Sequence, residues 1–190
     1  MITQALAATN GAKVYITSRG KEALNKVVEQ YHKGAKSKGI HLLVSNTGIA
    51  RVDKTRFDKA GKPDWSSAKA SYEHFMQSEQ EQWADTFRTN VTAQSFTTMA
   101  FLPLLEKGRN LSPGYTSSVV NIASISGVMN GTSGGQFAYA IFKVESIQPT
   151  RMMATTLVEA KIRVNCIASG SFPSEMTAGA SGEDQSPSSM

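Results

Sequence analysis

The sequence has only one cysteine, Cys166, among 190 residues, so it cannot form an internal disulfide. It also has no apolar run long enough to cross a bilayer, and its N-terminus lacks a basic segment followed by an apolar one. These absences predict a cytoplasmic protein in a reducing compartment, with no membrane partner. Cys166 itself lies in an apolar run, which favours a small core residue.

A metal-ligand set and a basic stripe are missing as well. The histidines, His32, His41 and His74, share no metal-ligand spacing, so no metal site is predicted. The formal net charge of +5 raises the question of nucleic-acid binding. However, the lysines and arginines are scattered, with no basic run beyond the loose segment HKGAKSK, so a nucleic-acid partner is not predicted. A phosphate-bearing small ligand fits the positive charge as well.

The order of apolar patterns indicates the fold class. A helix over 2–11, a strand over 12–19, a helix from 21 to 32 and a strand over 41–48 alternate along the chain. That rhythm predicts an α/β protein with a parallel sheet. The length suits one domain, which we place at 1–178, followed by a small and polar flexible tail at 179–190.

The middle of the chain contains a polar stretch and a strong helix. Residues 50–80 lack a firm period and predict a long surface excursion, with a short helix over 68–76. Residues 80–105 carry the strongest helical pattern, which we expect to end near Pro103. Another helix is expected to continue to about residue 160 despite Pro149, and the segment KIRVNCIAS predicts the last strand.

The stretch from Ser118 to Lys143 carries the candidate chemistry. Ser124 follows an apolar strand, at the edge where a parallel sheet exposes polar side chains. Tyr139 and Lys143 are four residues apart and share one helix face. An ammonium group near a phenol favours the phenolate, and a serine hydroxyl can hold a carbonyl oxygen. Taken alone, however, a tyrosine and a lysine at this spacing decorate many exposed helices.

Three motifs in order carry a family resemblance. The segments SVVNIASISG, YAIFK and RVNCIASGSFPSEMT resemble the short-chain dehydrogenase/reductase family, which has a strand-end serine, Tyr-x-x-x-Lys and a later Asn-x-Ile-x-Pro-Gly loop. The resemblance runs from the first helix to about Gly179. It implies a Rossmann-like parallel sheet flanked by helices. It also implies an oxidoreductase that transfers a hydride between a nicotinamide cofactor and a carbonyl or secondary-alcohol substrate.

The resemblance assigns roles at the chemical step. Tyr139 would donate the proton, while Lys143 would lower the tyrosine pKa and hold the nicotinamide ribose. Ser124 would bind the substrate oxygen. Ser126 is the alternative, and Ser124 is preferred for its family-like spacing to a following glycine. Asn90 matches the asparagine that completes the proton relay, although a plain polar helix residue remains an alternative.

The resemblance also indicates a cofactor. Relatives that use NAD place an acidic residue at the end of the strand that corresponds to the one expected here over 12–19. This chain has Ser18 and Arg19 there, which favours NADP over NAD. Alternatively, Arg19 only caps a turn. Asn46 corresponds to the family loop beside the adenine ribose. Ser171 and Thr177 lie where the last loop touches the nicotinamide carboxamide and the phosphates.

The chain also departs from the family pattern. It begins after the glycine-rich turn that holds the pyrophosphate, and it lacks a strand and helix between Lys36 and Ile40. We therefore expect an incomplete fold in which the strands near residues 13 and 41 become neighbours. An alternative function follows: a shortened, catalytically impaired member that acts as a binding or oligomerisation partner. A homo-oligomer stays open, although Glu145 and Pro149 disturb the helix that commonly forms the dimer interface.

A glycine-rich segment at 131–137 completes the set of motifs. It precedes the Tyr139 helix and does not follow a nucleotide-binding strand, so it is not a phosphate-binding fingerprint. We interpret it as a flexible substrate loop.

Overall fold

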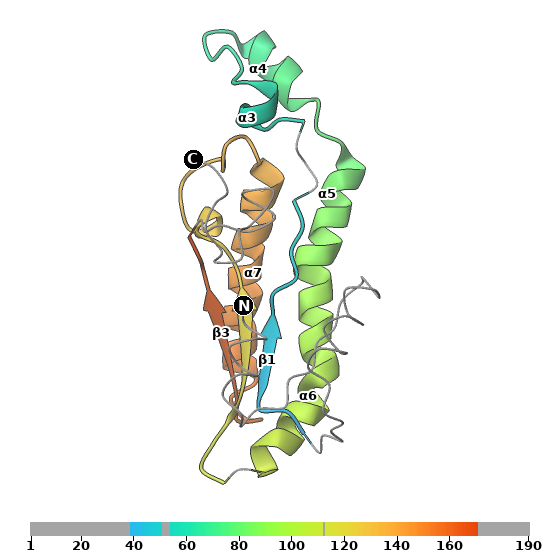
Figure 1. Ribbon diagram of the computed structural model, residues 1–190, viewed down its shortest axis with the longest axis vertical. Helices are drawn as coiled ribbons and strands as arrows, with labels where there is room; N and C mark the ends of the chain where they lie inside the picture. Colours follow the sequence, from blue (N-terminus) through green and yellow to red (C-terminus); the bar gives the residue numbers. More distant parts are fainter. Residues whose placement is uncertain (1–38, 51–53, 112, 171–190) are drawn as a thin grey trace, which may run out of the picture. The chain divides into compact units, whose positions relative to one another are not determined.

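A computed structural model describes residues 39–50, 54–111 and 113–170. The elements expected before residue 39, their proposed strand pairing and the C-terminal tail lie outside these ranges. The described elements, in chain order, are β1 (Leu42–Ser45), α3 (Phe57–Ala60), α4 (Ala68–Phe75), α5 (Gln80–Phe87), the π-helix η1 (Arg88–Thr92), α6 (Ala93–Leu111), β2 (Ser117–Ile122), the 3₁₀ turn η2 (Ile125–Gly127), α7 (Phe137–Thr156) and β3 (Ile162–Ile167) (Figure 1).

The described strands form a parallel sheet in the order β1-β2-β3. Val119 of the central strand pairs in register with Leu43 on one side and Val164 on the other. The prediction of a parallel α/β sheet flanked by helices is therefore confirmed within the described part of the chain. Since all three strands run the same way, the segments that follow Ser45, Ile122 and Ile167 emerge at one edge of the sheet.

Helices α6 and α7 cover the same face of the sheet. Leu105 and Val119 are fully buried, and Ile162 and Val164 nearly so, in one apolar cluster. The side chains that pack against this cluster come from both helices, namely Phe101, Leu102, Met153, Ala154 and Leu157. Burying each large side chain contributes about 1.5–3 kcal/mol, so this cluster fixes both helices on the sheet.

The long helix differs from its prediction. It continues beyond Pro103 to Leu111 instead of ending near the proline. A proline inside a helix costs about 3 kcal/mol, but burial of Leu105 and the packing of Phe101 offset that cost. Helix α7 likewise continues through Pro149 and ends at Thr156, four residues before the predicted end. None of the described helices is long and apolar enough to cross a membrane.

The predicted surface excursion is a small lobe, which we define as residues 54–79. Its expected helix is confirmed at Ala68–Phe75, where the Ser67 side chain accepts a hydrogen bond from the Ala70 amide at 3.2 Å. The short helix α3 was not predicted. An ion pair between Lys54 and Glu79 joins the two ends of the lobe.

Candidate active site

Ser124 lies just beyond the carboxyl end of β2. It is 9% exposed and its backbone is extended, with φ −155°. Its Oγ accepts a hydrogen bond from the Ser126 amide at 3.2 Å, which caps the η2 turn. The hydroxyl proton of Ser124 is not used in that bond and can be donated elsewhere. Ser126, the alternative serine, instead lines a separate hollow with Met129 and Ile141.

Lys143 is buried next to the end of the central strand. Its side chain is on α7, the residue is 7% exposed, and Nζ donates a hydrogen bond to the Ile122 carbonyl at 3.2 Å. Nζ also lies 5.7 Å from the centroid of the Tyr139 ring. Burial lowers the pKa of Lys143 below its ordinary value, and an electrostatic interaction with Cys166 opposes that shift. The Lys143 amine therefore sits between the strand end and the candidate proton donor.

Asn90 lies in the π-helical turn η1 and is 1% exposed. Its Oδ1 accepts from the Ile49 amide and its Nδ2 donates to the Ile49 carbonyl, both at 2.8 Å. The side-chain amide thus joins the helix to the loop after β1. Because both of its polar atoms are engaged, its visible role is to position that loop, and a part in a proton relay stays a prediction. Single π-turns inside helices occur frequently at functional sites.

Gly48 connects these groups. A Cβ built on Gly48 would lie 3.5 Å from Nζ of Lys143 and 3.8 Å from Oδ1 of Asn90. The loop after β1 therefore runs between the buried lysine and the buried asparagine. Asn46 is exposed in the same loop, at the carboxyl edge of the sheet. Sequence reasoning did not single out Gly48 or Ile49.

The structure thus brings most of the described candidates to one edge of the sheet. Tyr139, Lys143 and Asn90 are linked by the contacts above, and Ser124 starts the turn that packs on α7 next to Lys143. The other candidates, Ser18, Arg19, Ser171 and Thr177, lie outside the described residues, and their cofactor roles stay predictions. Across 39–50, 54–111 and 113–170, no three His, Cys, Asp or Glu side chains cluster as a metal site would require.

Two buried polar atoms next to this edge were not anticipated. Oγ of Ser45 and Oδ1 of Asn121 are buried and have no hydrogen-bond partner within the described ranges. The two residues pair in register on β1 and β2. Nδ2 of Asn121 donates to Thr150 Oγ1 at 2.9 Å, so the unsatisfied atom of the Asn121 side chain is its amide oxygen, Oδ1.

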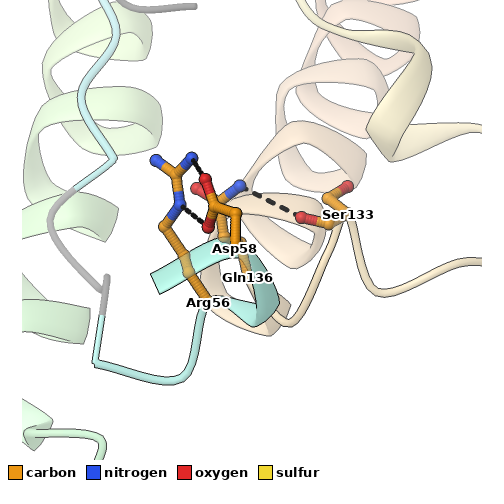
Figure 2. A network of polar contacts seen from close by, with 4 residues as sticks. All are labelled: Arg56, Asp58, Ser133 and Gln136. Carbon is orange, nitrogen blue, oxygen red and sulfur yellow. Dashed lines mark hydrogen bonds and ion pairs between the residues drawn. The ribbon is translucent and has the colours of Figure 1, made fainter. Parts of the chain in front are cut away.

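The glycine-rich segment at 131–137 differs from the flexible loop that was expected. The Phe57 amide donates to the Gly134 carbonyl and Thr55 Oγ1 donates to the Gly135 carbonyl, both at 2.8 Å. Figure 2 shows the two sides of this contact, with the Arg56–Asp58 ion pair on the lobe and the Gln136–Ser133 hydrogen bond on the loop. The loop is therefore held by the lobe.

Comparison with protein families gives a match over residues 2–190, to a family described as enoyl-(acyl carrier protein) reductase. The chain is 34% identical over 203 residues to the short-chain dehydrogenase/reductase PhomF′ of Diaporthe leptostromiformis, with 94% of this chain and 67% of the relative covered. It is 31% identical to a rhamnolipid-biosynthesis 3-oxoacyl-[acyl-carrier-protein] reductase of Pseudomonas aeruginosa, with 93% and 69% covered.

Solved structures give the same fold. The RhlG/NADP active-site complex of Pseudomonas aeruginosa matches with a TM-score of 0.52 and 28% identity, over 82% of this chain and 47% of that one. A 3-oxoacyl-[acyl-carrier protein] reductase of Brucella melitensis in complex with NAD matches in fold with a TM-score of 0.60 and 21% identity, over 94% and 62%. The chain spans about two thirds of these curated relatives and between 47% and 62% of these solved chains.

Proposed function

The chain belongs to the short-chain dehydrogenase/reductase family, and we propose that it transfers a hydride between a nicotinamide cofactor and a carbonyl or secondary-alcohol substrate. The observation that carries this proposal is the buried Lys143 amine, held by the Ile122 carbonyl at 3.2 Å and 5.7 Å from the centroid of the Tyr139 ring. A cation beside the ring stabilises the negative charge that develops on the phenol oxygen as its proton leaves.

The proton chemistry follows from three side chains. Ser124 keeps its hydroxyl proton, since its Oγ only accepts from Ser126, and it donates this proton in a hydrogen bond to the substrate carbonyl oxygen. Tyr139 transfers its own phenolic proton to the same oxygen as that oxygen gains negative charge. Lys143 stabilises the tyrosinate that is left. In alcohol oxidation the proton returns to Tyr139 by the same path.

The residues at this edge fit a nicotinamide cofactor. When bound, that cofactor supplies or accepts the hydride. Lys143 offers an ammonium beside Gly48, with Nζ 3.5 Å from the position that a Cβ of residue 48 would take, and this suits the hydroxyls of a ribose. The exposed Asn46 amide lies in the same loop and suits the adenine ribose. Ser171 and Thr177 are proposed to contact the carboxamide and phosphates on the resemblance alone.

We propose NADP rather than NAD as the cofactor. The support is the pair Ser18 and Arg19, which stands where relatives that use NAD carry an acidic residue. A cation there binds a 2′-phosphate, whereas a carboxylate would repel it. Related solved structures carry both NADP and NAD, so they support a nicotinamide cofactor without separating the two.

The test combines a binding titration with one substitution. NADPH fluorescence is titrated against the 190-residue chain, and reduction of acetoacetyl-CoA is followed as a first ketone, because several relatives are 3-oxoacyl reductases by name. We expect saturable binding by the chain and by Tyr139→Phe, with reduction about 100-fold slower in the variant. Tyr115→Phe, which removes an exposed phenol just before β2 and outside the lobe, is the matched control and leaves the rate unchanged.

The opposite outcome is equally clear. Absence of NADPH binding at millimolar concentration, with the chain folded by circular dichroism, contradicts the proposal. That result favours the alternative of a shortened member that acts as a binding partner.

A further inference from the structure

The lobe and the loop before α7 meet through backbone and side-chain hydrogen bonds. Besides the amide of Phe57 bound to Gly134, the hydroxyl of Thr55 donates to the Gly135 carbonyl, and Thr55 is only 2% exposed. Gly135 has φ +88°, and a Cβ there would lie 2.1 Å from the Thr55 carbonyl oxygen. The contact is therefore close and requires glycine at this position.

His74 extends this contact into helix α4. It is 8% exposed, and Nε2 lies 3.1 Å from the Thr55 carbonyl oxygen. Because a carbonyl only accepts hydrogen bonds, Nε2 carries the proton and donates it. The Phe75 ring packs edge-on against His74, with ring centroids 5.0 Å apart, and restricts its orientation. His74, Thr55 and Gly135 thus form one chain of hydrogen bonds from the lobe to the loop.

An aromatic contact reaches α7 directly. Phe75 packs edge-on against Phe137 with ring centroids 5.1 Å apart, and Phe137 is the first residue of α7. Tyr139 follows two residues later on the same helix. The lobe therefore contacts both the loop and the helix turn from which the candidate proton donor projects.

The carboxyl edge of the sheet, which carries the candidate site, is also held by contacts that do not involve this loop. Lys143 is tied to Ile122, and Gly127 packs on the main chain of α7. The loop between η2 and α7 is joined to the lobe by the two hydrogen bonds described above, from Phe57 to Gly134 and from Thr55 to Gly135. Within the loop, the Gly135 amide donates to Thr132 Oγ1 and Gln136 Nε2 donates to the Ser133 carbonyl, while the Gln136 carbonyl accepts from the Ala140 amide of α7.

We propose that His74 and Thr55 are positioning residues which hold the loop at 131–136 and the first turn of α7, so that the lobe forms part of the substrate-recognition surface. The substrate part of this inference rests on the proposed oxidoreductase function. The physical linkage between lobe and loop does not, and it can be measured without cofactor or substrate.

Hydrogen–deuterium exchange of the full chain tests the linkage. Thr55→Val keeps the branched shape but removes the hydroxyl donor, and His74→Phe keeps a ring but removes Nε2. We expect amides of residues 131–139 to exchange about two- to tenfold faster in either variant, the effect of one lost hydrogen bond. Thr55→Ser and His74→Gln restore a donor and the slow exchange, while Glu73→Gln, an exposed change on the same helix, has no effect.

Gly135→Ala approaches the same contact from the loop side. The added Cβ would clash with the Thr55 carbonyl oxygen, so this substitution separates the loop from the lobe without changing a lobe residue. It therefore tests the linkage even if Thr55→Val unfolds the lobe. Peptides covering residues 57–75 report whether the lobe stays folded. Unchanged exchange of residues 131–139 in both Gly135→Ala and Thr55→Val overturns the proposal, whatever the catalytic activity of the chain.

Kinetics separate positioning from a purely structural role. In Thr55→Val, we expect the KM for acetoacetyl-CoA to rise about fivefold while the KM for NADPH stays within twofold, with recovery in Thr55→Ser. An equal rise in the KM values for acetoacetyl-CoA and for NADPH points to general destabilisation and contradicts a substrate-side role. A wild-type chain without turnover contradicts the proposed function, and the exchange data still decide the linkage.

Discussion

Gly127 lies directly against the main chain of Lys143, so close that a Cβ on Gly127 would come within 2.5 Å of the lysine carbonyl carbon. This contact packs the η2 turn, which Ser124 caps, onto the helix that carries the buried amine. The spacing Ser-x-x-Gly was recognised in the sequence as a pattern. Its physical reason is that only glycine lets the turn approach α7 so closely.

Gly127→Ala should therefore reduce both stability and activity. The added methyl group meets backbone atoms that cannot rotate away, and overpacking of this kind costs about 1–3 kcal/mol. We expect the free energy of unfolding in urea to fall by that amount, and ketone reduction to fall with it as Ser124 moves from Tyr139. Gly131→Ala is the matched control for stability, because a Cβ added at Gly131 would meet nothing within 4 Å. Equal stability of the two variants would refute this role of Gly127.

Several features of the fold were predictable because they depend on local patterns. Apolar runs indicated the three described strands, and residue spacing indicated the long helix from residue 80 and the helix with Tyr139 and Lys143. The continuation of α6 past Pro103 was not predictable, because the burial of Leu105 against the sheet decides it.

Parts of the candidate site were hidden in the sequence for a similar reason. Asn90 and Ile49 are 41 residues apart, and Thr55 and Gly135 are 80 apart. Their contacts arise only when the sheet brings distant segments together, and no local period reports them. A glycine-rich composition alone therefore suggested a flexible loop, whereas the lobe holds it.

Lys143→Met should change how stability depends on pH. Burial lowers the pKa of Lys143 in the folded protein, so the unfolded state binds more protons at pH values between that lowered pKa and the ordinary lysine pKa of about 10.4. The contribution of Lys143 to the free energy of unfolding therefore rises with pH through that window. Methionine has no such titration and keeps a similar volume.

The measurement compares urea unfolding of the two proteins from pH 7 to 10. We expect the stability of Lys143→Met relative to wild type to be highest at pH 7 and to decline as the pH rises. Lys161→Met, on the exposed turn before β3, is the control and shows no such trend. A difference that stays constant with pH would mean that Lys143 is not desolvated in solution.

Arg19→Asp tests the cofactor preference proposed from the sequence. A carboxylate at this position repels a 2′-phosphate and accepts hydrogen bonds from ribose hydroxyls. Loss of a charge-assisted contact of about 1.5–3 kcal/mol weakens NADPH binding about 10- to 150-fold, while NADH binding holds or improves. Fluorescence titration with both cofactors measures the ratio. Lys21→Asp is the neighbouring control, and an equal change in both variants would assign the effect to general charge instead of to Arg19.

Ser45 and Ser117 provide a matched pair for the cost of a buried hydroxyl. Both are buried serines, on β1 and β2, but Ser45 Oγ has no hydrogen-bond partner within the described ranges, whereas Ser117 Oγ lies 2.6 Å from the Leu105 carbonyl. Ser117→Ala leaves that buried carbonyl without its side-chain donor and should lower the free energy of unfolding by about 1 kcal/mol. Ser45→Ala removes an unsatisfied polar atom and should leave stability unchanged or raise it by up to about 1 kcal/mol. Urea unfolding of both variants measures the difference. If Ser45→Ala destabilises as much as Ser117→Ala, then Ser45 has a partner in solution, and the unpaired Asn121 oxygen at the same register position is the first group to examine.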